Sequence, residues 1–320
     1  MIGLNHGLKP LAWKATSPIF SLAAALLAWL AALQGKKFDN DGTRDGLFWP
    51  TVQQSVLLQL PLTQRVRLPA VRMSLGASVE ELVSAAADCN RAAEGAICQA
   101  ETFAIERREG GPRLVRSFFL DITEVSLAAY NRCVRSGRCP SPLLAPPGPA
   151  NVDPLLLPVV GVTQRQASLF CAFQGGRLPT EDEFERAARG SQGRRYPWGK
   201  LYHAGRLNGG TWGLGLTARA DGFEELAPVS AFADGQTPEG VRQLVGNAEE
   251  WTSSEPHAVD VASAGAMNSS VRVVRGGHFA DPPWHLRATV RRFAEADEIS
   301  STRGFRCAKN DPRAAARRTP

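Results

Sequence analysis

The second half of the sequence contains no long segment of periodic hydrophobicity. From Gly190 onward there are short apolar runs, Trp-Gly and Gly-Gly pairs and Asp-Gly turns, with one strand candidate at 302–308. Amphipathic helices and half-buried strands would show sustained periods of 3.6 or 2 residues. A large irregular region in a compact domain is usually functional, or is held by metal ions and disulfides. The sequence therefore predicts a loop-rich fold stabilised by such links.

The first half carries the recognisable elements. We expect strands at 67–76 and 113–122, helices at 78–89 and 124–134, and a Pro-rich loop at 140–158. Two capping boxes then follow, in which a Thr is followed three residues later by Gln or Glu. Thr163 and Gln166 begin one helix within 159–173, and Thr180 and Glu183 begin the next, which ends at Gly190. The regular structure therefore precedes the irregular part.

The net charge of +6 suggests a protein that binds polyanions, but the charge lies at the two ends. Residues 1–37 contain four lysines and no acid, and residues 309–320 contain four basic residues and one acid. The near-neutral part between them gives no argument for nucleic acid as a partner. An apolar content of 43% excludes a wholly disordered chain, and the 30 Gly and 22 Pro show no collagen-like period.

The sequence has six cysteines and no CxxC pair, which argues against a zinc ribbon or a thioredoxin-type site. Two short-range pairings are available, Cys89 with Cys98 and Cys133 with Cys139. They favour disulfides in an oxidising compartment over scattered cytosolic thiols, although chance spacing produces the same pattern.

Residues 15–33 are uncharged and mostly apolar, and Lys14 and Lys36 flank them. A membrane-spanning helix needs about 20 apolar residues and a signal-peptide core about 7–15, so the segment suits either role. A buried core helix is the third reading. No convincing cleavage site follows, which favours an uncleaved anchor, and the cysteines favour an extracytoplasmic, periplasmic or secreted-side domain. The expected division is an anchor or signal at 1–37, a linker at 38–66, a domain at 67–308 and a basic tail at 309–320.

Six segments occur in the order and approximate spacing of one family. They are GGRLPTEDEFERAARG (175–190), YPWG (196–199), DGFEELAPVSAF (221–232), LVGNAEEWTSS (244–254), RVVRGGHF (272–279) and GFRCA (304–308). Over residues 68–308 the chain resembles the formylglycine-generating enzyme family, also called the sulfatase-modifying factor domain. The resemblance implies an α+β, C-type-lectin-like fold with two main helices on a small antiparallel sheet and little regular structure elsewhere.

The same resemblance implies calcium as a cofactor. In the related oxidases one calcium is held by residues that correspond to Asn208, Gly209, Asp221 and Phe223. A second would use Gln243, Gly246, Ala248 and Glu250, a weaker site because Gln243 stands where an acid or Asn is usual. Side-chain and backbone oxygens are the ligands that calcium prefers. The alternative for the first site is an ordinary turn.

The resemblance does not extend to copper. The oxidases need two cysteines soon after the RGGS run, because two soft thiolates bind Cu(I) and one exchanges with the substrate thiol. Here those positions hold Asp281 and approximately Leu286, His278 replaces the serine, and Glu249 replaces a tryptophan. The family's sulfoxide synthases bind iron through an additional helical domain whose HxxxHxE-like motif is missing from this sequence. Neither copper nor iron is therefore expected.

A different iron site remains conceivable on the residues alone. His278, Asp281 and His285 could form a two-His, one-carboxylate triad, with Glu249 as a base or fourth ligand. Against this reading, Pro282 and Pro283 make the local path rigid, and a hydrogen-bonded surface pair is the simpler interpretation.

Other family positions indicate structural roles. We expect Arg306 and Trp251 to be buried and paired. Lectin-like folds often join a helix to the last strand by a disulfide, which would fall on Cys171 and Cys307. Two unpaired buried thiols are the alternative.

The sequence thus predicts an exported or membrane-anchored, calcium-stabilised domain that acts as a binding or accessory module. A protein, peptide or glycan ligand would lie in a cleft formed by Glu249, His278, Asp281, Trp284 and Arg287. The alternative is a metal-dependent oxidoreductase that uses His278, Asp281 and His285.

Overall fold

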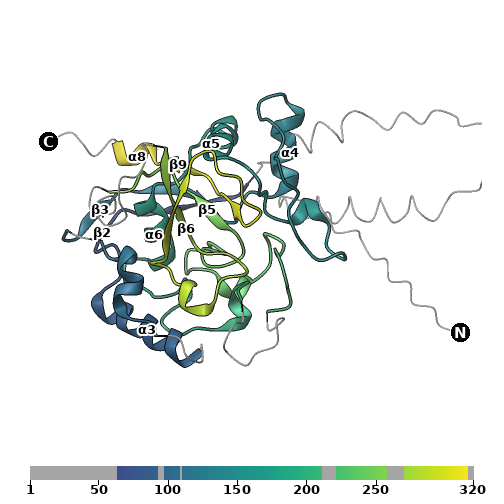
Figure 1. Ribbon diagram of the computed structural model, residues 1–320. Coiled ribbons are helices and arrows are strands. Elements are labelled where there is room, and N and C mark those ends of the chain that lie inside the picture. The colour runs from purple at the N-terminus through teal and green to yellow at the C-terminus, as the bar shows by residue number, and fades with distance from the viewer. Residues whose placement is uncertain (1–62, 93–96, 109, 211–220, 258–269, 316–320) are drawn as a thin grey trace, which may run out of the picture. The chain divides into compact units, whose positions relative to one another are not determined.

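The computed structural model describes residues 63–92, 97–108, 110–210, 221–257 and 270–315 (Figure 1). The expected anchor at 15–33 and nearly all of the linker lie outside these ranges, so the expected domain boundaries stay a prediction. Within the described ranges, no helix has both the length and the hydrophobicity needed to cross a bilayer.

In the described ranges, helices and strands are both short, and the strands form three small sheets. The α-helices are α3 (Val79–Ala92), α4 (Leu127–Arg135), α5 (Gln164–Phe173), α6 (Glu181–Arg189) and α8 (Pro312–Ala315). The 3-10 helices are η1 (Ala100–Glu106), η2 (Pro154–Leu156), η3 (Ala204–Arg206), η4 (Ala233–Gly235) and η5 (Pro283–His285). This mixed arrangement confirms the predicted α+β class.

The sheets join segments that are far apart in the sequence. One has the order β1 (Arg65–Leu68), β4 (Phe118–Asp121), β9 (Ala308–Asn310), and another pairs β2 (Val71–Met73) with β3 (Arg113–Val115). The largest has the order β7 (Arg291–Glu295), β6 (Val271–Arg275), β5 (Glu249–Trp251), β8 (Arg303–Gly304). Neighbouring strands in these sheets are antiparallel except β5 and β8, which are parallel. The last strand therefore closes the first sheet.

The predicted helix starts are confirmed. The Thr163 hydroxyl accepts from the backbone N–H of Gln166 at 3.1 Å, and the Thr180 hydroxyl accepts from that of Glu183 at 3.2 Å. In both boxes the side chain at the third helical position accepts from the backbone N–H of the capping Thr. Each box therefore satisfies two N–H groups that the helix itself leaves without partners.

The strand predictions were less accurate. The segment predicted as one strand at 67–76 contributes to two, β1 and β2, because Pro69 cannot donate to a ladder. The segment at 113–122 likewise divides into β3 and β4. The sequence indicated only one strand after Gly190, whereas the four-stranded sheet lies entirely there. Its strands have two to five residues, too short for a period to be recognised.

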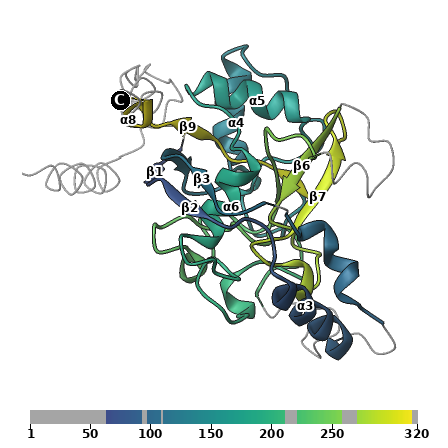
Figure 2. The same ribbon diagram turned by 90° about the vertical axis from the view of Figure 1, so that its left-hand side faces the viewer.

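The main core lies between the four-stranded sheet and helices α4 and α5. It contains Tyr130, Phe170, Trp251 and Phe305, all fully buried. The indole N–H of Trp251 donates to the Val162 carbonyl at 2.9 Å, as expected for a buried structural tryptophan. Figures 1 and 2 show α3 on the opposite side of the domain from α4 and α5.

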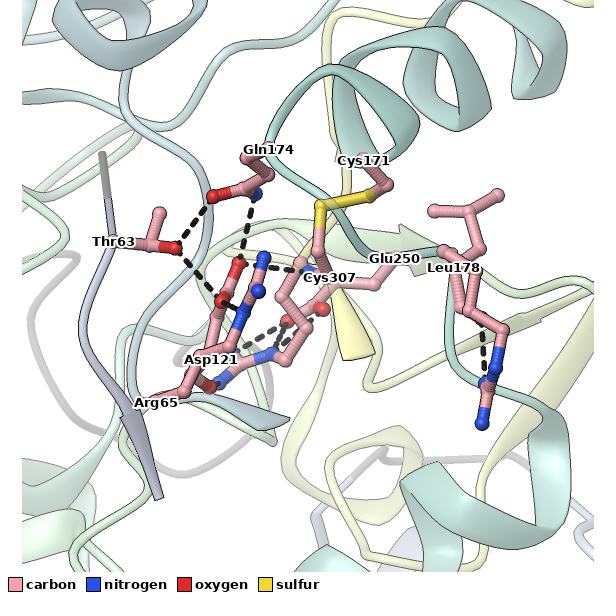
Figure 3. Close-up of a disulfide and its surroundings, with 10 residues drawn as sticks. Thr63, Arg65, Asp121, Cys171, Gln174, Leu178, Glu250 and Cys307 are labelled. Atoms are coloured by element: carbon pink, nitrogen blue, oxygen red, sulfur yellow. Dashed lines mark hydrogen bonds and ion pairs between the residues drawn. A yellow bond between two sulfur atoms is a disulfide. The ribbon is translucent and has the colours of Figure 1, made fainter. Parts of the chain in front are cut away.

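All six cysteines form disulfides, and every predicted pairing is confirmed. The bonds are Cys89–Cys98, Cys133–Cys139 and Cys171–Cys307. The last joins α5 to the C-terminal segment across 136 sequence positions (Figure 3). Three disulfides are typical of a protein from an extracellular or otherwise oxidising environment.

The residue before Cys307 makes the central buried ion pair. The Arg306 guanidinium donates to both carboxylate oxygens of Glu250 on β5, at 2.6–3.0 Å, and to the Gln243 carbonyl at 3.0 Å. Its remaining N–H groups point to the carbonyls of Asp121 and Ile122, at the end of β4, at 3.3–3.4 Å. Arg306 is therefore buried and paired, as predicted, and it also ties two sheets together.

We expect Arg306→Met to lower the free energy of unfolding by about 3–5 kcal/mol, because it leaves the buried Glu250 carboxylate without its partner. The matched control is Arg272→Met on β6, whose guanidinium lies 3.4 Å from the largely exposed Glu255. An exposed pair contributes at most about 1 kcal/mol. Urea unfolding of both variants is the measurement, and equal losses would contradict the central role of Arg306.

Candidate functional site

The segment from His278 to Arg287 turns sharply after β6 and runs through η5. Its only carboxylate, Asp281, accepts from both terminal nitrogens of Arg292, at 2.7 and 2.5 Å, and from the backbone N–H of His278 at 2.8 Å. Arg292 lies on β7 and also reaches the Glu249 carboxylate at 3.3 Å. Asp281 is therefore held in an ion pair by its own domain.

The predicted iron triad does not form. His278 Nε2 lies 3.6 Å from Asp281 Oδ1, but the His285 ring packs against Phe103, with 5.4 Å between ring centroids. Burial lowers the pKa of His285, so the ring stays neutral near pH 7. Among the residues that the structure describes, no group of three or more His, Cys, Asp or Glu side chains is arranged to hold a metal ion.

Glu249 is unavailable as a base or fourth ligand. Its side chain is buried, and Oε1 accepts from Arg303 Nε at 2.8 Å while Oε2 accepts from Arg292. Both partners are arginines, which keep their charge at any physiological pH. The carboxylate is therefore part of a structural network that links β5, β7 and β8.

Four of the five residues predicted to form the ligand cleft are buried: Glu249, Asp281, Trp284 and Arg287. Trp284 belongs to a small core with α3 and η1, and its relative exposure is 5%. Arg287 is also buried: it donates to Glu106 Oε1 on η1 and to the Trp284 carbonyl, and its guanidinium lies 5.2 Å from the centre of the Phe103 ring. Arg287 therefore faces η1, and Trp284 packs mainly against α3 and η1, so the two do not form an open cleft with Glu249, His278 and Asp281.

Glu106 is the residue that the sequence did not reveal. Burial raises the pKa of its carboxyl, while Arg287 and the Thr289 hydroxyl, which donates at 2.7 Å, act in the opposite direction. It lies in a 3-10 helix more than 180 positions from both partners. No local pattern predicts such a contact.

The first predicted calcium set does come together. The Asp221 carboxylate accepts from the backbone N–H groups of Gly209 and Phe223, both at 2.9 Å. The Asn208 amide donates to the Glu225 carbonyl at 2.8 Å, whereas its buried Oδ1 has no hydrogen-bond partner among the described residues. A buried oxygen without a donor, on the residue before one whose backbone N–H binds a carboxylate, suits a hard cation. These residues therefore fit calcium.

The second predicted set is only partly suited. Gln243 Oε1 is buried without a hydrogen-bond partner in the described structure, but the Glu250 carboxylate is engaged by Arg306. Gly246 and Ala248 occupy the turn between them, and Gly246 has a φ of +80° with no room for a Cβ against the Asn208 carbonyl. Gln243 is neutral where the family usually has an acid or Asn. The nearby Glu124 carboxylate would supply the negative charge that Gln243 lacks.

Glu124 was not among the predicted ligands. It is fully buried, its Oε1 accepts from Asn247 Nδ2 at 2.9 Å, and its Oε2 has no partner in the described parts of the chain. Burial raises the pKa of this carboxyl to about 8, with the nearby Glu250 adding to the effect against the opposing charge of Arg306. A divalent cation at this place would favour the ionised form. Glu124 therefore fits as the acid of the second site.

Asn247 connects the two sets. Its side chain accepts from Asn208 Nδ2 at 2.9 Å and donates to Glu124, while its backbone N–H donates to the Asn208 carbonyl at 2.8 Å. The residue is fully buried and has a φ of +60°, a conformation that Asn tolerates better than most residues. One asparagine thus fixes the geometry of both candidate sites.

Residues 92–311 match the sequence profile of the sulfatase-modifying factor enzyme 1-like domain. Similar curated proteins include the inactive C-alpha-formylglycine-generating enzyme 2 of Bos taurus, 39% identical over 51% of this chain and 54% of the relative. The formylglycine-generating enzyme of Mus musculus is 34% identical over 47% and 44%. Hercynine oxygenase of Mycolicibacterium smegmatis is 34% identical over 42% and 33%.

The chain spans about half the length, or less, of these curated relatives. Among solved structures, PvdO from Pseudomonas aeruginosa superposes with a TM-score of 0.55 at 22% identity, over 77% of this chain and 94% of PvdO. That likeness concerns the fold alone. Helix α3, one of the two elements that pack against Trp284, precedes the matched residues except at its last position.

We expect the packing of His285 under Phe103 to make stability dependent on pH. Because the pKa of His285 is lower in the folded state than its unfolded value of about 6.5, the unfolded chain binds this proton first, and stability is lost as the pH falls below about 6.5. His285→Phe keeps an aromatic ring against Phe103 and removes the proton. Urea unfolding at pH 7.5 and 5.5 should show a smaller acid loss in the variant; an equal loss would contradict this role.

Proposed function

The chain belongs to the sulfatase-modifying factor enzyme 1-like domain family, and on that basis we propose that it is a member without formylglycine-generating activity that acts as a binding or accessory module. The proposal includes stabilisation by calcium and a position outside the cytoplasm, anchored by or exported through residues 15–33. Similarity to relatives named inactive supports the non-catalytic part.

The single observation that carries the proposal is the closed state of the segment that corresponds to the thiolate positions of the oxidases. Asp281 is paired with Arg292, and Leu286 is fully buried. Neither side chain supplies the soft sulfur ligands that bind Cu(I) or the thiol that exchanges with a substrate cysteine. All six cysteines are in disulfides at other places in the fold. The copper-thiolate reaction has no residues to perform it.

The alternative, an oxidoreductase that uses His278, Asp281 and His285, gains support only from a family relative named hercynine oxygenase. The geometry does not favour it, because Arg292 neutralises Asp281 and His285 packs against Phe103. We therefore retain the binding module as the proposed function.

Calcium would act structurally in this proposal. Asn208, Gly209, Asp221 and Phe223 would hold one ion, and Gln243, Gly246, Ala248, Glu250 and the additional Glu124 the other. The ions would supply positive charge to buried oxygens that the protein leaves without donors. The turns around Gly209 and Gly246 belong to no regular sheet or helix, so a bound cation would replace the missing ladder of hydrogen bonds.

The activity proposal is tested with a peptide that contains a sulfatase-type cysteine motif, incubated with the full chain, copper and oxygen. We expect no aldehyde product by mass spectrometry, whereas the Mus musculus formylglycine-generating enzyme, as the positive control, should convert the peptide. Conversion by this chain at a comparable rate would overturn the proposal.

The calcium proposal predicts that chelation lowers the midpoint of thermal unfolding and that Asp221→Asn removes much of this response. A ligand at about 100 times its dissociation constant stabilises the folded state by about 2.7 kcal/mol. Asp234→Asn, on the exposed 3-10 helix η4, is the matched control and should keep the full response. If wild type, Asp221→Asn and Asp234→Asn respond equally to calcium, the first site is not a calcium site.

A further inference from the structure

A pocket of about 290 Å³ opens beside the closed segment. It lies between the C-terminal half of α3, the loop around Tyr196 and the start of η5. Its lining residues are Asp88, Arg91, Ala92, Tyr196, Tyr202, Pro283 and Trp284. The volume approaches that of small-molecule sites, which are commonly 300–1,000 Å³.

The pocket has rigid aromatic walls. Tyr196 stacks on Trp198 with 5.3 Å between ring centroids and 11° between planes, and the edge of Tyr202 meets Tyr196 at 6.0 Å. Trp284 is held from behind by the core of α3 and η1. Fixed rings of this kind bind a planar or large apolar group at little cost in side-chain entropy.

The rim of the pocket carries an excess of positive charge. Asp88 accepts from Arg91 and also from Arg195, whose Nη2 lies 2.5 Å from Asp88 Oδ2. Two guanidinium groups thus share one carboxylate. The Arg91 side chain is 71% exposed, and only its Nη2 has a hydrogen-bond acceptor in the described structure. The other N–H groups of Arg91 remain able to bind a carboxylate from solution.

Tyr202 supplies a neutral donor to the same space. The residue lines the pocket, and burial raises the pKa of its phenol to about 12. The hydroxyl therefore stays protonated at physiological pH. Arg91 and Tyr202 thus provide two donors to the pocket, and its one lining carboxylate, Asp88, is already engaged by Arg91 and Arg195.

We propose that this pocket binds an aromatic carboxylate, with the ring against Tyr196, Tyr202 and Trp284 and the carboxylate at Arg91. The ligand is either the C-terminal residue of a peptide or a free small acid of the same chemistry. The inference rests on the proposed binding role and names its ligand class. Asp88 and Arg91 precede the residues that match the family profile, so the charged side of the pocket is a feature of this chain rather than of the matched domain.

The test is isothermal titration calorimetry of the full chain in detergent with three probes. The probes are N-acetylphenylalanine, its amide, and a tetrapeptide that ends in phenylalanine with a free carboxylate. We expect the acid to bind at least about tenfold more tightly than the amide, as one charge-assisted hydrogen bond provides. Tighter binding of the tetrapeptide than of the single residue would identify a peptide terminus as the source, and equal binding a small acid.

Variants separate the contacts. Arg91→Gln should reduce the preference for acid over amide to about twofold or less, and Tyr202→Phe should weaken acid binding several-fold while leaving the fold intact. Arg72→Gln, an exposed arginine on β2, is the matched control and should bind as wild type does.

Three results would overturn the inference: no binding of any probe, equal affinity for acid and amide, or an Arg91→Gln variant with an unchanged preference. These outcomes are distinct from failure of the proposed function. Formation of an aldehyde in the sulfatase-motif assay would overturn the non-catalytic assignment and leave the calorimetric result as it stands.

Discussion

The fold depends on one buried ion pair, Arg306 with Glu250. Two fully buried charged groups persist only when every donor and acceptor is matched, and here the guanidinium bonds both carboxylate oxygens and three backbone carbonyls. Those partners belong to β5, to the end of β4 and to the turn before Gly246. The adjacent Cys307 adds a covalent bond to α5, and its N–H donates to Asp121 (Figure 3). In a domain whose strands are all short, these bonds hold β5, the end of β4 and α5 together.

The same kind of contact accounts for the loss of an open site. Arg292 holds Asp281, Arg287 holds Glu106, and Arg303 holds Glu249, so three carboxylates around the segment 278–287 are paired with arginines. Each of these carboxylates accepts from a permanently charged guanidinium and is thereby held in place. The acids that the sequence suggested as metal ligands or bases near His278 and His285 are therefore members of structural ion pairs.

The sequence predicted correctly those features that depend on interactions between residues close together in the chain. Capping boxes at Thr163 and Thr180 predicted both helix starts, because the bonds join residues three positions apart. Motif order predicted the family and the Cys171–Cys307 bond. The four-stranded sheet was missed because its strands are too short to show a period, and the closure of the cleft was missed because Glu106 lies far from Arg287 in the chain. Contacts of that range depend on the whole fold.

The two candidate cation sites and the closed segment are not independent features. Asn247 links Asn208 to Glu124 through its side chain, and its carbonyl accepts from the backbone N–H of Phe279, next to His278. The turn that would carry the ions thus fixes the start of the segment that α3 and η1 cover. The two side-chain bonds of Asn247 are buried, where hydrogen bonds are electrostatically stronger than in water. Hydrogen bonds therefore connect the candidate cation sites to the segment that contains Trp284, and in the proposed binding module they would hold one wall of the pocket in place.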